Sequence, residues 1–98
     1  MISTQVDAAA LLGDPLRTRI VELLATEELC TCHLVTELDA RQPTISHHLR
    51  VLREAGVVEV EPHGKFTYYR LRPEAVEELS ARLAELASSA RQARRRPC

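Results

Sequence analysis

Two short amphipathic segments joined by about four residues constrain the fold of this chain more than any other feature. The first segment carries apolar residues at helical spacing from Leu34 to Leu38. The second is opened by Pro43 and ended by Gly56, with apolar residues at the same spacing between them. Two helices joined this closely form a helix-turn-helix, which we place at about residues 31–55.

Further helices and a hairpin are predicted around this unit. The Asp14-Pro15 pair is typical of a helix start, and that helix is expected to run to about Ala25. A shorter helix is expected over residues 6–12. β-branched and aromatic residues on both sides of a turn predict one hairpin, the wing, within about residues 57–71. The predicted fold is mainly α with one β-hairpin: a winged helix-turn-helix in which four helices precede the hairpin and one follows it.

The last helix, expected over about residues 73–93, carries a narrow apolar seam. Its apolar residues are spaced three and four apart: Val76, Leu79, Leu83, Leu86 and Ala90. This heptad-like spacing suits pairing with another helix, and a small domain gains stability from such pairing. We expect residues 1–98 to form a single DNA-binding domain that assembles as a homodimer through this helix. The alternative is a helix that packs within its own chain.

The net charge of −1 hides an uneven distribution of charge along the sequence. Residues 1–40 hold two arginines against seven acidic residues, whereas residues 41–72 hold six basic residues against three acidic ones. Phosphate contact depends on local rather than total charge. We therefore expect the middle third of the chain to contact double-stranded DNA.

The remaining composition predicts the cellular compartment. No apolar run approaches the roughly 18 residues that span a bilayer, and the N-terminal region lacks the basic start of a secretory signal. We therefore expect a cytoplasmic protein without a membrane partner. The chain has three cysteines, Cys30, Cys32 and Cys98. In a reducing cytosol a close cysteine pair indicates metal or redox chemistry rather than a structural disulfide.

The second helix of a helix-turn-helix reads base edges in the major groove with residues near its N-terminus. At about 100° per residue, the side chains of His47 and Arg50 fall opposite the buried stripe, and His48 falls at its shoulder. Amide, hydroxyl and guanidinium groups match the donors and acceptors of base edges. The predicted DNA contacts are Gln42, Thr44, Ser46, His47 and Arg50, with Lys65 at the hairpin turn.

Cys30 and Cys32 stand at the start of the first helix of the helix-turn-helix, for which Thr31 is the expected cap. On a regular helix their sulfurs would diverge by about 200°, but an extended turn at a helix start can bring them together. Thiolates bind soft ions such as As(III), Sb(III), Cd(II) and Pb(II). On spacing alone, two buried structural cysteines are an equal alternative.

The cysteine segment and the second helix both resemble a known family. Residues 28–34, Glu-Leu-Cys-Thr-Cys-His-Leu, resemble the ELCVCDL box of the ArsR/SmtB metalloregulators. Residues 42–58 look like that family's recognition-helix signature, and the likeness covers roughly residues 8–72. It implies a homodimer that binds an operator without metal and releases it when an inducer binds Cys30 and Cys32.

The resemblance also bears on which ion is sensed. The arsenic sensors of the family carry a third cysteine where this chain has Val35. Some relatives recruit a C-terminal cysteine, often across the dimer, so Cys98 is a candidate third ligand. His33 replaces the usual aspartate of the box. We expect it to be a solvated residue of the first helical turn; the alternative is a nitrogen ligand, which would favour Zn(II) or Cd(II). The resemblance implies As(III) or Sb(III) as inducer, with Cd(II) or Pb(II) next and no organic cofactor.

Two other classes of protein stay open from the sequence. A thiol-redox repressor would be controlled by oxidation of Cys30 and Cys32. A thiol oxidoreductase would use one of these cysteines as nucleophile and His33 as base, but the sequence offers no third group to orient the base. An enzyme would also leave the helix-turn-helix without a role, so we do not expect one.

Overall fold

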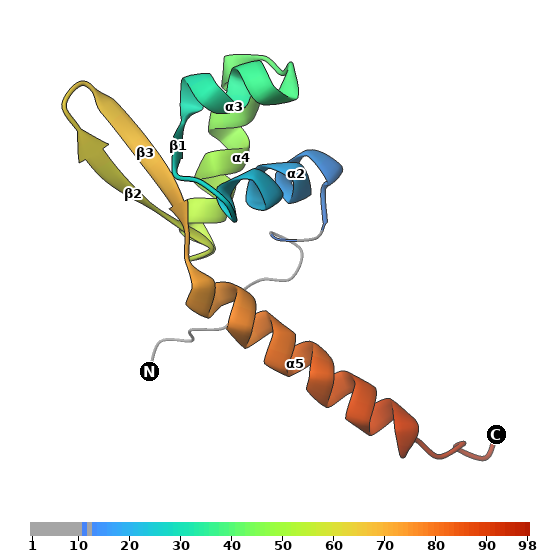
Figure 1. The fold of residues 1–98 in the computed structure, drawn as a ribbon. Coiled ribbons are helices and arrows are strands. Elements are labelled where there is room, and N and C mark those ends of the chain that lie inside the picture. The colour runs from blue at the N-terminus through green and yellow to red at the C-terminus, as the bar shows by residue number, and fades with distance from the viewer. Residues whose placement is uncertain (1–10, 12) are drawn as a thin grey trace.

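The computed structural model describes residue 11 and residues 13–98. Its elements are α2 (Pro15–Leu24), β1 (Leu29–Cys30), α3 (Thr31–Leu38), α4 (Gln42–Glu54), β2 (Val58–His63), β3 (Phe66–Leu71) and α5 (Pro73–Arg91). Figure 1 shows α2, α3 and α4 packed together, with the β2–β3 hairpin, the wing, at their side. The predicted winged helix-turn-helix is confirmed. The helix expected over residues 6–12 lies, apart from Leu11, outside the described residues.

The sheet contains one strand that the sequence analysis did not predict. β1 pairs antiparallel with β3, which gives the strand order β1-β3-β2. In this pairing Leu29 lies opposite Tyr69, and Cys30 lies opposite Tyr68. A strand of two residues is too short to leave an alternating pattern in the sequence. The predicted element order therefore needs β1 added before α3, and this strand ties the cysteine segment to the wing.

The amphipathic face of α4 fixes how this helix presents its polar side. Ile45, Leu49 and Leu52 are buried almost completely, and fully burying such a side chain is worth about 1.5–3 kcal/mol. They join a core that also contains residues of α2, α3 and the start of the wing: Ile20, Leu34, Val57 and Val58. Gly56 adopts a φ of 78°, a left-handed conformation that ends the helix and turns the chain into β2. The opposite face of α4 is therefore directed to solvent.

Asp14 fixes the start of α2 and also faces α4. Its Oδ1 accepts hydrogen bonds from the backbone N–H of Leu16 at 2.8 Å and of Arg17 at 3.2 Å. The bond from Arg17 is the main reason why the pKa of Asp14 is lowered. His48 of α4 places its Nε2 3.9 Å from the same carboxylate. The N-terminus of α2 thus lies beside the middle of α4.

α5 extends away from the rest of the molecule (Figure 1). The radius of gyration is 16.4 Å, against about 13 Å for a compact domain of this length. Leu79 is buried, whereas Val76, Leu83 and Leu86 are exposed, Leu86 by 66%. The distal part of the predicted seam is therefore not packed within its own chain. None of the helices in the described ranges is long and apolar enough to cross a bilayer.

Replacing Leu49 by alanine tests the core that positions α4. Leu49 is only 1% exposed, so Leu49→Ala leaves a cavity and should lower the free energy of unfolding by about 2–5 kcal/mol. Arg53→Ala, on the exposed side of the same helix, should change it by less than about 0.5 kcal/mol. Urea denaturation followed by circular dichroism measures both values. Equal losses for the two variants would contradict the burial of this face.

Candidate metal site and nucleic-acid interface

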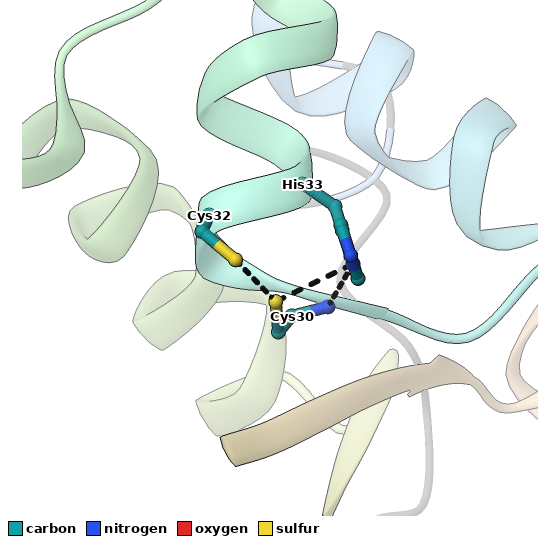
Figure 2. Close-up of side chains that lie close together, drawn as sticks. All are labelled: Cys30, Cys32 and His33. Atoms are coloured by element: carbon teal, nitrogen blue, oxygen red, sulfur yellow. Dashed lines mark hydrogen bonds between the residues drawn. The ribbon is translucent and has the colours of Figure 1, made fainter. Parts of the chain in front are cut away.

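Cys30 is both the last residue of β1 and the N-cap of α3. Its backbone is extended, with φ −90° and ψ 170°, so its side chain turns toward the first helical turn. Its Sγ lies 2.7 Å from the Sγ of Cys32 (Figure 2). The N-cap is therefore one residue earlier than the expected Thr31. This geometry brings the two thiols together at the helix start while α3 stays regular.

His33 contributes a third donor atom beside the two sulfurs. Its Nδ1 accepts a hydrogen bond from the backbone N–H of Cys30 at 3.2 Å and lies 3.3 Å from Cys30 Sγ (Figure 2). The donor atoms of Cys30, Cys32 and His33 all lie within 4.8 Å of one another. Sulfur and imidazole nitrogen are the ligands that Zn(II) and related soft ions prefer. These three residues therefore have the chemistry and proximity to hold a thiophilic ion.

The position of His33 follows from a spacing that the sequence already contained. His33 is the third residue after the N-cap, where a side chain reaches back to the cap's backbone N–H. With Thr31 as the expected cap, the third residue after the cap would be Leu34, which has no side-chain group that can accept a hydrogen bond. Identifying Cys30 as the cap places His33 in the cluster.

The two thiols ionise unequally. Burial raises the pKa of the Cys30 thiol, but hydrogen bonds from Cys32 Sγ–H and from nearby backbone N–H groups, first that of His33, outweigh it and lower the pKa. The pKa of Cys32 is raised, first because its thiol proton is held by Cys30 and then by desolvation. Metal ions bind the thiolate form. The pair therefore offers one readily formed thiolate and one thiol that must release its proton on binding.

Cys98 does not join this cluster within one protomer. It is exposed and lies beyond the end of α5 at Arg91. Figure 1 places the C-terminus at the distal end of that helix, away from β1 and α3. Val35, where the arsenic sensors carry cysteine, packs against the core. A Cys98 ligand would have to come from a second protomer, and this role stays a prediction.

The predicted DNA-contacting residues of α4 share its solvent-directed face. The exposed set comprises Gln42, Thr44, Ser46, His47 and Arg50. Arg50 Nη2 lies 3.3 Å from His47 Nδ1, which orients both side chains along the helix. His48 is 12% exposed at its side chain, in agreement with its expected place at the helix shoulder. Burial lowers the pKa of His48, although the Asp14 carboxylate opposes this effect.

The turn of the wing carries one basic side chain toward solvent. Gly64 adopts a φ of 62° in this turn, and Lys65 beside it is exposed. Arg70 forms an ion pair with Glu59 across the two strands. His63 lies 3.4 Å from Glu61. The geometry leaves Lys65 directed outward at the tip, and its contact with DNA stays a prediction.

Comparison with known proteins matches the helix-turn-helix and the cysteine segment to one family of regulators. Residues 14–60 match the family model described as bacterial regulatory protein, arsR family. The chain is 40% identical over 75 residues to an uncharacterized HTH-type transcriptional regulator of Methanocaldococcus jannaschii, covering 76% of this chain and 84% of the relative.

Two further relatives carry names that state a response. The chain is 48% identical over 64 residues to the arsenical resistance operon repressor of Escherichia coli, covering 64% of this chain and 55% of the relative. It is 38% identical over 69 residues to a cadmium resistance transcriptional regulatory protein CadC homolog of Staphylococcus aureus, covering 69% and 57%. The chain thus spans little more than half the length of these two relatives.

Solved structures share the fold. One, described as a possible transcriptional regulator for arsenical resistance, is 34% identical with a TM-score of 0.71, and the match covers 96% of this chain and 100% of that one. A homodimeric winged helix-turn-helix DNA-binding domain from Mycobacterium bovis is 27% identical with a TM-score of 0.66, covering 93% and 83%. The relatives and the fold are those of transcriptional regulators rather than enzymes.

The unequal thiols predict a two-step titration in a Cys98→Ser background, in which only Cys30 and Cys32 contribute. The first thiolate should form below the pH at which free cysteine ionises, and the second above it, because one proton is shared between the sulfurs. In Cys32→Ala the donor to Cys30 is gone, so the remaining thiol should ionise at higher pH than the first step. Ultraviolet absorbance of the thiolate, followed against pH, measures each ionisation step. An unchanged first step would show that Cys32 does not stabilise the Cys30 thiolate.

Proposed function

Since this chain belongs to the ArsR family of bacterial transcriptional regulators, we propose that it is a repressor controlled by a thiophilic ion. In this proposal a homodimer binds operator DNA and releases it when the ion binds Cys30 and Cys32. One observation carries the proposal: the two sulfurs lie 2.7 Å apart at the head of α3. That helix packs against α4, which bears the proposed DNA-reading face.

Binding of one ion by both sulfurs would tie Cys30 and Cys32 to one point and replace the sulfur–sulfur contact that they make without the ion. Cys30 is buried and paired with β3, whereas Cys32 is exposed in the first turn of α3. The adjustment would therefore act on α3 relative to β1. Such a displacement couples the ion site to the DNA-binding elements, as allosteric control requires.

We propose As(III) or Sb(III) as the leading inducer. Two thiolates that converge on one point suit these thiophilic ions. The named response of the Escherichia coli relative, arsenical resistance, supports this choice. A third sulfur, which a trigonal As(III) site would use, could come from Cys98 of a second protomer.

A Cd(II)- or Pb(II)-responsive repressor is the second candidate, and the position of His33 favours it. The imidazole Nδ1 lies 3.3 Å from Cys30 Sγ, and a nitrogen donor suits Cd(II) better than arsenite. The cadmium resistance relative from Staphylococcus aureus is consistent with this alternative. A thiol-redox repressor remains a third reading, since two adjacent thiols can also be oxidised.

The proposed assembly uses the surfaces that the fold leaves exposed. Paired α5 helices would cover Leu83 and Leu86, which are 47% and 66% exposed, and the related Mycobacterium bovis domain is described as homodimeric. The DNA surface would be the exposed face of α4 together with Lys65 at the wing tip. A two-fold dimer would then present two such faces to two half-sites of an operator.

Loss of one sulfur should separate DNA binding from induction. Cys32→Ser keeps the fold because Cys32 is exposed, so operator affinity should stay near that of the unchanged chain while release by ions is lost. The operator duplex is first selected from a random-sequence library by its binding to the ion-free chain. Fluorescence anisotropy of this duplex then measures how much of it stays bound when arsenite, Cd(II), Pb(II) or peroxide is added in separate titrations. Release by peroxide alone would contradict ion sensing.

Two matched variants identify the third donor in the same titrations. Cys98→Ser should weaken release by arsenite if the partner protomer supplies a sulfur, and an unchanged arsenite response would exclude Cys98. His33→Ala should weaken release by Cd(II) more than by arsenite if the imidazole is a ligand. Loss of operator binding in Cys32→Ser would instead make this cysteine structural.

Arg50 tests the proposed DNA-reading face. Arg50→Ala should weaken operator binding by about 1–3 kcal/mol, roughly 5- to 150-fold, because a guanidinium contact to a base or phosphate is lost. Ion binding, followed by thiolate–metal absorbance, should be unchanged. Arg19→Ala is the control, since Arg19 is also exposed but lies on α2. Equal weakening in both variants would indicate general charge attraction and contradict a specific role for Arg50.

A further inference from the structure

Tyr68 lies between the candidate ion site and the wing. It is opposite Cys30 in the β1–β3 pairing. Its ring is 6.0 Å from that of His33, at an interplanar angle of 53°. It also packs edge-on against the ring of His63, at 5.4 Å and 84°. One side chain therefore touches a residue of the ion site and a residue near the tip of the wing.

The wing is one continuously paired ribbon. β2 and β3 pair continuously, from Val58 opposite Leu71 to His63 opposite Phe66. The residues around the turn, 61–67, are exposed. A displacement of β3 at Tyr68 would therefore be carried along the ribbon to Lys65 at the turn.

Ion binding would disturb the contact between His33 and Tyr68 for a chemical reason. The Nδ1 of His33 has one lone pair, which now accepts the hydrogen bond from the backbone N–H of Cys30. If Nδ1 binds an ion instead, that hydrogen bond is lost and the imidazole must turn. The ring then shifts against Tyr68. The backbone of Cys30 loses its hydrogen bond to His33 and keeps its pairing with β3.

We propose that Tyr68 is a positioning residue that transmits occupancy of the thiol–imidazole site to the wing. The inference rests on the second candidate of the proposed function, in which His33 is a ligand of Cd(II) or Pb(II), and adds a route to it. Besides the path from α3 to α4, the ion acts through His33, Tyr68 and β3 on the orientation of Lys65. Release of DNA would then depend in part on the aromatic ring at Tyr68, although this ring is a ligand of neither ion nor DNA in the proposal.

The aromatic ring of Tyr68 can be removed by substitution while the ion site of Cys30, Cys32 and His33 stays in place. Tyr68→Leu abolishes the aromatic contacts, Tyr68→Phe keeps them, and Phe66→Leu is the control. Phe66 lies on the same face of β3 because it is two residues away, is 56% exposed, and has no ring contact with His33 among the described residues. Three quantities are measured for each chain: Cd(II) affinity by thiolate–metal absorbance, operator affinity without Cd(II), and operator affinity with saturating Cd(II).

The ratio of the two operator affinities reports the coupling. The unchanged chain should show a ratio within the usual range of about 5- to 150-fold. Tyr68→Leu should bind Cd(II) and ion-free operator within about threefold of the unchanged chain, while its ratio falls to about a third of the original or less, the remainder being carried by the path from α3 to α4. Tyr68→Phe and Phe66→Leu should keep the original ratio. An unreduced ratio in Tyr68→Leu would overturn the proposal.

A spectroscopic measurement tests the route without a substitution at Tyr68. In ¹H–¹⁵N spectra the backbone amides of Gly64 and Lys65 should shift when Cd(II) is added to the unchanged chain but not when it is added to Cys32→Ser. This control accounts for Cd(II) bound directly at the wing, where Glu28, Glu61 and His63 also bring donor atoms within 4.8 Å of one another. Shifts confined to α3 and α4 would overturn the role of Tyr68. If Cd(II) binds but the unchanged chain keeps its operator, Cd(II) induction fails, whereas the amide shifts still decide whether the site reaches the wing.

Discussion

The junction at Cys30 is the constraint on which the rest of the structure depends. Its backbone closes the β1–β3 pairing on one side and begins α3 on the other. The direction of α3, the convergence of the two sulfurs and the attachment of the wing are therefore set by the same residue. A change at this position cannot remain local, because strand and helix share one short piece of backbone.

Dense packing of α3 and α4 allows a displacement at this junction to reach the DNA-reading face. Ile45 and Leu49 hold α4 against the core, and Leu34 and Leu38 do the same for α3. Densely packed side chains transmit displacement rather than absorb it. The polar residues of α4 need no network of their own to be oriented, because the buried face of the helix already directs them outward.

Periodicity explains what the sequence could predict. The recurrence of apolar residues located α3, α4 and the seam of α5, and the clustered β-branched and aromatic residues located the wing. β1 was missed because two residues carry no period, and its pairing with β3 depends on residues about 40 positions later. The closeness of His33 to Cys30 depends on which residue caps α3, and a cysteine is an unusual cap. The place of Cys98 relative to the pair depends on assembly, which a single chain's pattern does not encode.

The exposed seam of α5 has a consequence for dosage. Leu83 and Leu86 are exposed in one chain, and on the proposed assembly a second chain covers them. The DNA-binding species then forms in proportion to the square of the monomer concentration while monomers predominate. Repression would then rise steeply with the amount of protein rather than in proportion to it. A cell could silence or open the regulated promoter with a modest change in synthesis or degradation of this chain, even before any ion arrives.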